Sequence, residues 1–237
     1  ITAHEFQHLI NFVNHCILAP TCLVQDDPWM NEGLSMLAED FAVHQLFPNV
    51  QYDVDEALFF GAQFLQSPQS FNVAAFAGID AGQTAPALYC NGCYGGAYLF
   101  QRYLYNRFGG DAYTRAMETG AGTSGTNLSA FANETPQALV GDFSIALAAA
   151  QNGVSATNPF TFAIAPGSTF VDQFGNPMTL PALGSVGQSA LGSSTIYNSC
   201  EGCFFYVGVP TNKTSATLKV TDTSQVSAAL AAGVVQH

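Results

Sequence analysis

The sequence predicts a mainly helical domain over residues 1–155, followed by a small all-β domain over residues 156–237. The first observation behind this is that apolar residues recur at helical spacing in the first part of the chain. The second is that the remainder alternates short β-prone runs with glycine, proline and asparagine turns. The third is composition: 48% of the 237 residues are hydrophobic and only 9% are charged, which supplies a sizeable core.

The helices are predicted in order along the first part. Residues 2–16 form the first, and a turn-rich break leads to Pro28, where a second helix begins that stops at Pro48. The runs VDEALFFGAQFLQ and GGAYLFQRYLYNRFGG continue the helical pattern. The run TPQALVGDFSIALAAAQNG predicts a last helix, with Thr135 as its N-cap and Gly153 as its stop.

The charge balance excludes several classes of partner. Seventeen Asp and Glu outnumber five Lys and Arg, and the formal net charge is -12. Nucleic-acid binding needs basic patches that neutralise phosphate, and anionic membrane surfaces attract basic segments, so we expect neither partner. We also expect no membrane span, because no run approaches the roughly 18 consecutive apolar residues that one requires.

The cysteines predict disulfide bonds and a secreted, extracellular protein, because closely spaced pairs are typical of local disulfides formed in an oxidising compartment. The alternative for CNGC and CEGC is a four-cysteine zinc site, but over a hundred residues separate these two pairs. Whether each pair closes on itself or the two cross-link stays open. The three pairs are Cys16/Cys22, Cys90/Cys93 and Cys200/Cys203.

The chain begins ITAHEFQHLINFVNH, in which His4 and His8 stand four residues apart around Glu5. Side chains at this spacing project from one face of a helix, so both imidazoles can reach one zinc ion at roughly 2.0–2.1 Å. Glu5 lies next to His4 and can take a proton from a water activated by the metal. The alternative is a surface helix that carries incidental histidines. The spacing therefore predicts a zinc site with Glu5 as its general base.

A third ligand is predicted at Glu32, in the run WMNEGLSMLAED, twenty-four residues beyond His8. A carboxylate in the first turn of a second helix that crosses the first completes a set of two histidines and one glutamate. An isolated glutamate at such a position is explained by its favourable interaction with the helix dipole. Since this one follows HEFQH, we interpret it as a ligand.

The combination of HEFQHLIN with WMNEGLSMLAED resembles the gluzincin metallopeptidases, the thermolysin-like group, and in particular the hyicolysin-type family of secreted bacterial neutral proteases. The resemblance covers roughly residues 3–40 and 89–110, including the stretch YGGAYLFQRYLYNRFG. It implies a zincin-like catalytic domain and a zinc-dependent endopeptidase that acts on proteins or peptides. It also implies His4, His8 and Glu32 as ligands and Glu5 as the base.

The supporting residues of the site follow from the same resemblance. In the thermolysin-like group an aspartate four residues beyond the ligand glutamate orients a zinc histidine, and here that position is Met36. We predict Glu39, seven residues after Glu32, in this supporting role, with an ordinary helix carboxylate as the alternative. For the donor that faces the developing oxyanion we predict Tyr94 first and Tyr98 second. A tyrosine that packs its ring in a core is the alternative for either.

The front of the gluzincin fold is missing from the sequence. In that family a β-sheet before the HExxH helix supplies an edge strand that binds substrate, and here only Ile1 to Ala3 precede His4. We therefore expect a leader or pro-segment and an N-terminal lobe that is either cleaved off or associated as a separate chain. The alternative function is a non-catalytic fragment or structural component of an extracellular assembly that retains a zincin fold.

Calcium is a second candidate cofactor, because secreted proteases often bind it. The acidic candidates lack the glycine and the spacing of an EF-hand loop, so we interpret them as solvated loop charges. They are Asp26, Asp27, Asp53, Asp55 and Glu56.

Overall fold

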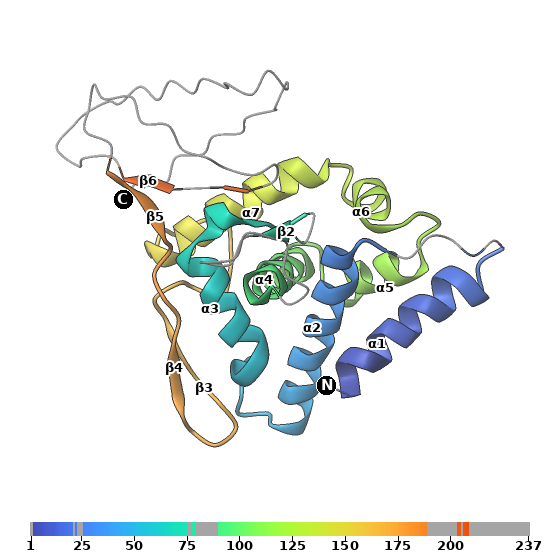
Figure 1. Ribbon diagram of the computed structural model, residues 1–237, viewed down its shortest axis with the longest axis horizontal. Helices are drawn as coiled ribbons and strands as arrows, with labels where there is room; N and C mark the ends of the chain where they lie inside the picture. The colour runs from blue at the N-terminus through green and yellow to red at the C-terminus, as the bar shows by residue number, and fades with distance from the viewer. Residues whose placement is uncertain are drawn as a thin grey trace.

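The protein is mainly helical in a computed structural model, which describes residues 2–20, 22, 26–74, 77–78, 90–188, 203–204 and 206–208 (Figure 1). None of the described helices is both long and apolar enough to cross a membrane. The helices are α1 (Thr2–Phe12), η1 (Val13–Ile17), α2 (Pro28–Leu46), η2 (Val54–Leu58), α3 (Phe59–Gln66), η3 (Pro68–Ser70), α4 (Asn91–Arg107), α5 (Asp111–Thr119), α6 (Ser124–Ala132) and α7 (Pro136–Gln151).

Helix α4 lies at the centre of the molecule, where α2, α3, α5 and α7 all contact it (Figure 1). Its side chains Tyr98, Phe100 and Tyr103 are fully buried. Phe143 of α7 packs on the last two of these, with 5.5 Å between ring centroids in each pair. Because most residues from Gly92 to Leu104 are buried, α4 is surrounded by the other helices and fixes their positions.

The predicted boundaries of the second and the last helix in the first part are confirmed. Helix α2 begins at Pro28, in the first-turn position that proline favours, and ends before Pro48. Helix α7 begins after Thr135, whose Oγ1 accepts a hydrogen bond from the backbone N–H of Ala138 at 3.2 Å. It ends two residues before Gly153, which has a positive φ of 61°.

Helix α1 turns its polar side chains inward and its apolar side chains to solvent. Gln7 Nε2 donates to Glu118 Oε1 on α5 at 2.6 Å, and Asn11 Nδ2 donates to Asp26 Oδ2 at 2.6 Å. Both Gln7 and Asn11 are buried. Hydrogen bonds therefore dock α1 on the described part of the molecule, and an apolar face points away from it. The exposed apolar residues of α1, η1 and the next residue are Phe6, Leu9, Ile10, Phe12, Ile17 and Leu18.

Two of the predicted disulfides are present. Cys16 is bonded to Cys22, which ties the end of η1 to the loop before α2. Cys90 is bonded to Cys93, so the CNGC pair closes on itself at the start of α4 rather than joining a four-cysteine zinc site. In the third predicted pair, Cys200/Cys203, Cys200 lies outside the described residues.

The predicted fold class is wrong in its all-β C-terminal module. Among the described residues after 155, the strands form one antiparallel hairpin and one short parallel pair. The hairpin pairs β3 (Thr169–Val171) with β4 (Pro177–Thr179), and the parallel pair joins β5 (Ser185–Gln188) to β6 (Tyr206–Gly208). A third small pair, β1 (Phe71–Asn72) with β2 (Ala77–Gly78), belongs to the helical part.

The described part of the segment after residue 155 does not form a separate β-sheet core, because its buried apolar residues pack on the helices. Ile164, Leu180 and Leu183 are buried in the same core as the helices. The hydroxyl of Tyr206 donates to the backbone oxygen of Ser144 on α7 at 2.7 Å. Short apolar runs broken by glycine and proline here cover helices instead of building a core between two sheets. The domain division at residues 155/156 stays a prediction, because much of the second part lies outside the described residues.

Helices α3 and α4 pack closely against each other at Gly95. A Cβ at this position would collide with the backbone carbonyl of Phe60 and approach the Gly61 nitrogen to 2.6 Å, and backbone atoms cannot rotate away. We expect Gly95→Ala to lower the free energy of unfolding by about 1–3 kcal/mol, measured by chemical denaturation.

The matched control is Gly61→Ala in the same interface. A Cβ there meets only the flexible Leu99 side chain at 3.4 Å, so the gain in helix propensity is retained. We expect a change within about 1 kcal/mol. Equal destabilisation by the two substitutions would contradict the close backbone approach at Gly95.

Candidate metal centre

Helices α1 and α2 bring the three predicted ligands together. His4 Nε2 lies 3.2 Å from Glu32 Oε2, and His8 Nε2 lies 3.5 Å from the same oxygen. The two imidazole rings stand edge to face, with 4.8 Å between their centroids. All three side chains are only partly exposed, at 14% for His4, 25% for His8 and 22% for Glu32. One nitrogen of each ring therefore converges with one carboxylate oxygen at the surface between the two helices.

These separations fit a zinc ion. Ligand atoms at 2.0–2.1 Å in tetrahedral directions are roughly 3.3–3.4 Å apart. The observed separations of 3.2 and 3.5 Å lie on either side of that value, and the three ligand atoms all lie within 4.8 Å of one another. Three protein ligands leave the fourth tetrahedral position open, as catalytic zinc sites require. Among the residues that the structure describes, this is the only group of three or more His, Cys, Asp or Glu that could hold a metal.

The pKa values of the three groups are shifted by their contacts with one another. Although burial opposes it, the hydrogen bond with Glu32 and the nearby carboxylate of Glu39 raise the pKa of His4 to about 9. The hydrogen bond with Glu32 likewise raises the pKa of His8. Burial works against ionisation of Glu32 as well, but its contacts with both histidines lower its pKa to about 2. Protons on the imidazoles here take the place that a divalent cation would occupy.

His8 is oriented by residues that the sequence did not single out. Its Nδ1 donates to Asn31 Oδ1 at 3.0 Å, which leaves Nε2 directed at Glu32. The Ser35 hydroxyl lies 3.1 Å from the same nitrogen and also contacts Gln7 on α1. Asn31 and Ser35 are one helical turn apart on the helix that carries Glu32, so the sequence places both on one face. This spacing alone does not indicate that they contact a histidine.

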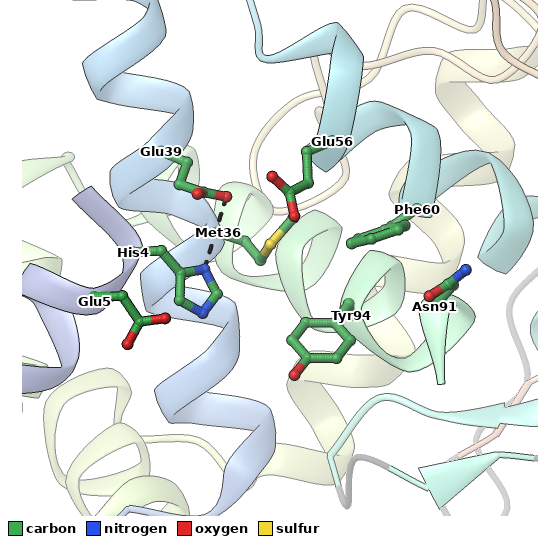
Figure 2. A pocket seen from close by; sticks show the side chains of 8 residues that line it. All are labelled: His4, Glu5, Met36, Glu39, Glu56, Phe60, Asn91 and Tyr94. Atoms are coloured by element: carbon green, nitrogen blue, oxygen red, sulfur yellow. Dashed lines mark ion pairs between the residues drawn. The ribbon is translucent and has the colours of Figure 1, made fainter. Parts of the chain in front are cut away.

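Glu39 lies beside the His4 ring. Its Oε2 is 3.7 Å from His4 Nδ1 (Figure 2), whereas Glu32 contacts Nε2 of the same ring, and the Glu39 carboxylate is buried. Met36, at the position of the gluzincin aspartate, lies beneath the two groups in the wall of a pocket (Figure 2). The supporting role of Glu39 itself remains a prediction.

Two of the three predicted catalytic residues line the pocket, and the third does not. Glu5 is exposed and lines the pocket together with His4 from one side, while Tyr94 on α4 lines it from the other (Figure 2). Tyr98 is fully buried in the core and does not line this pocket. Burial raises the pKa of its hydroxyl well above the usual value. Of the two predicted oxyanion donors, Tyr94 is the one that lines this pocket.

Two of the acidic residues considered for calcium, Asp26 and Asp53, are engaged in local contacts. Both oxygens of Asp26 accept hydrogen bonds, from Asn11 and from the hydroxyl and backbone N–H of Ser124. Asp53 caps η2 by accepting from the backbone N–H of Asp55 at 3.2 Å. These contacts are typical of capping and docking carboxylates.

No protein-family model matches the chain, and no curated protein matches it. The likeness to gluzincins therefore depends on the two motifs and on the geometry described above.

The raised pKa of His4 predicts that metal binding expels protons. In the metal-free chain the His4–Glu32 pair stabilises the fold fully below the ordinary histidine pKa of 6.5, and this stabilisation is lost as pH rises through about 9. Because zinc binds neutral imidazole, we expect zinc added at pH 7 to release at least about one proton per ion. Calorimetry in buffers of different ionisation enthalpy measures this number.

The controls are two histidine variants. His4→Asn should weaken zinc binding by more than about 100-fold, because it removes a ligand rather than an outer contact. His44→Asn, on the same helix as Glu32 but hydrogen-bonded to the backbone oxygen of Val50, should leave zinc binding and proton release unchanged. Zinc binding at pH 7 without proton release would contradict the assignment of His4.

Proposed function

We propose that this chain is a zinc-dependent endopeptidase of the gluzincin type. The observation that carries the proposal is the convergence of His4 Nε2, His8 Nε2 and Glu32 Oε2, with Glu5 and Tyr94 lining the adjoining pocket. It adds spatial proximity to the spacing of HEFQH and Glu32 in the sequence.

The residues of the chain have distinct tasks in this proposal. A zinc ion held by the triad supplies Lewis-acid activation of a water molecule and of the scissile carbonyl. The Glu5 carboxylate accepts the proton of the attacking water and later passes it to the nitrogen of the leaving amine. The Tyr94 hydroxyl donates a hydrogen bond to the oxygen on which negative charge develops. Asn31 and Glu39 hold the His8 and His4 rings in register for the metal.

The proposal includes secretion. Two disulfides support an oxidising environment during maturation. The low share of charged residues, 9%, fits a surface built largely from uncharged polar groups. Proteins or peptides in the extracellular medium are the substrates in this proposal.

A structural component of an extracellular assembly is the second candidate. It is favoured by the apolar side chains that α1 and η1 expose, including Phe6 at 60% and Ile17 at 61%. Exposed apolar patches mark interaction surfaces in many proteins. In that case the metal would stabilise the fold without catalysis.

Glu5→Gln separates the two candidates. The substitution removes the proton acceptor but no ligand, so zinc content should stay at the wild-type level. We expect the rate of peptide cleavage to fall by about 10²–10⁴-fold. The measurement is hydrolysis of casein-type and fluorogenic substrates, with metal content determined on the same samples.

A chelator with subsequent zinc addition is the control on the wild type. Activity should disappear with the chelator and return with zinc. A zinc-loaded wild-type chain that cleaves no peptide would favour the structural candidate, and an active Glu5→Gln variant would remove Glu5 from the mechanism.

A further inference from the structure

The pocket beside the metal centre has the size of one amino-acid side chain. Its volume is about 220 Å³, below the roughly 300–1,000 Å³ of sites for drug-sized ligands. Met36 lies at its base, and Phe60 and Tyr94 form an aromatic wall with 5.9 Å between their ring centroids (Figure 2). Because His4 and Glu5 line the same pocket, a side chain inside it belongs to a residue close to the cleaved bond.

The lining of this pocket contains three carboxylates. Its eight lining residues include Glu5, Glu39 and Glu56, and none is Lys or Arg. Glu39 faces His4, and Glu5 is the proposed base, so both are assigned to the metal centre. Glu56 enters from η2 on the opposite side, and its carboxylate is directed into the pocket (Figure 2). Among the described residues, no hydrogen bond or ion pair engages that carboxylate, whereas its backbone N–H donates to Asp53.

The surroundings of Glu56 are also negative. Burial raises the pKa of Asp53 to about 6, and the charges of Glu39, Asp40 and Glu56 add to this effect. Arg102, the arginine next to Asp40, is already paired with it at 2.9 Å. A cation entering the pocket would therefore find a carboxylate that no described cation neutralises.

We propose that this pocket selects a lysine or arginine side chain of the substrate, with Glu56 as the specificity-determining residue. This inference rests on the proposed peptidase function. The methylene stem of the substrate side chain packs between Met36, Phe60 and Tyr94, and its cationic head pairs with Glu56. The two aromatic faces add a cation–π contribution. The net charge of -12 attracts cationic peptides over longer distances.

The test uses quenched peptides of one sequence, in which a single arginine or its neutral isostere citrulline is moved through the positions on either side of the cleaved bond. At one position the zinc-loaded wild type should prefer arginine over citrulline by about 10- to 100-fold in kcat/KM. Glu56→Gln should remove this preference while citrulline peptides are still cleaved. The comparison within the wild type does not depend on any variant.

The matched control is Asp55→Asn, which neutralises the adjacent carboxylate. Asp55 is exposed and accepts a hydrogen bond from Gln173 at 2.8 Å, away from the pocket lining, so the arginine preference should persist. Equal cleavage of arginine and citrulline peptides, or a preference retained in Glu56→Gln, overturns the pocket assignment alone. A wild type that cleaves no peptide of the set overturns it together with the peptidase function.

Discussion

The approach of His4 to Glu32, at 3.2 Å, is the interaction on which the arrangement of the site depends. It joins two helices that meet through polar contacts on the α1 side. Helix α2, in contrast, is set firmly against α4: a Cβ at Gly33, next to Glu32, would lie 2.6 Å from Gln101 Cγ and 3.0 Å from the backbone oxygen of Ala97. The glutamate is therefore the fixed partner, and the histidines are brought to it.

The division of labour among the helices follows from this. Helix α1 carries two of the proposed ligands and the proposed base, and α2 carries the third proposed ligand together with Asn31 and Glu39, which lie beside the histidines. The segment η2 and helix α4 contribute the opposite side of the pocket, through Glu56 and Tyr94. The catalytic residues and the residues that select the substrate would thus lie largely on different elements. The substrate specificity could then change while the catalytic residues stay the same.

The ligand set could be predicted from the sequence because helical periodicity alone places His4 and His8 on one face, and the NE motif pointed to Glu32. Glu56 could not be given its place in the pocket, because its position there depends on how η2 packs against α4, which no local pattern encodes. The C-terminal part was mistaken for a separate β module for a related reason. Short β-prone runs have the same composition whether they pair with each other or lie over helices, and Ile164 and Leu180 lie in the helical core.

The inverted amphipathic character of α1 has a thermodynamic consequence. Water can replace the hydrogen bonds of Gln7 and Asn11, so the docked position of this helix has little hydrophobic stabilisation behind it. An ion that binds only when α1 and α2 are together stabilises their association by its own binding free energy. The cation would then hold α1 against α2 in addition to its role in catalysis. Formation of the metal site and docking of α1 would therefore occur together.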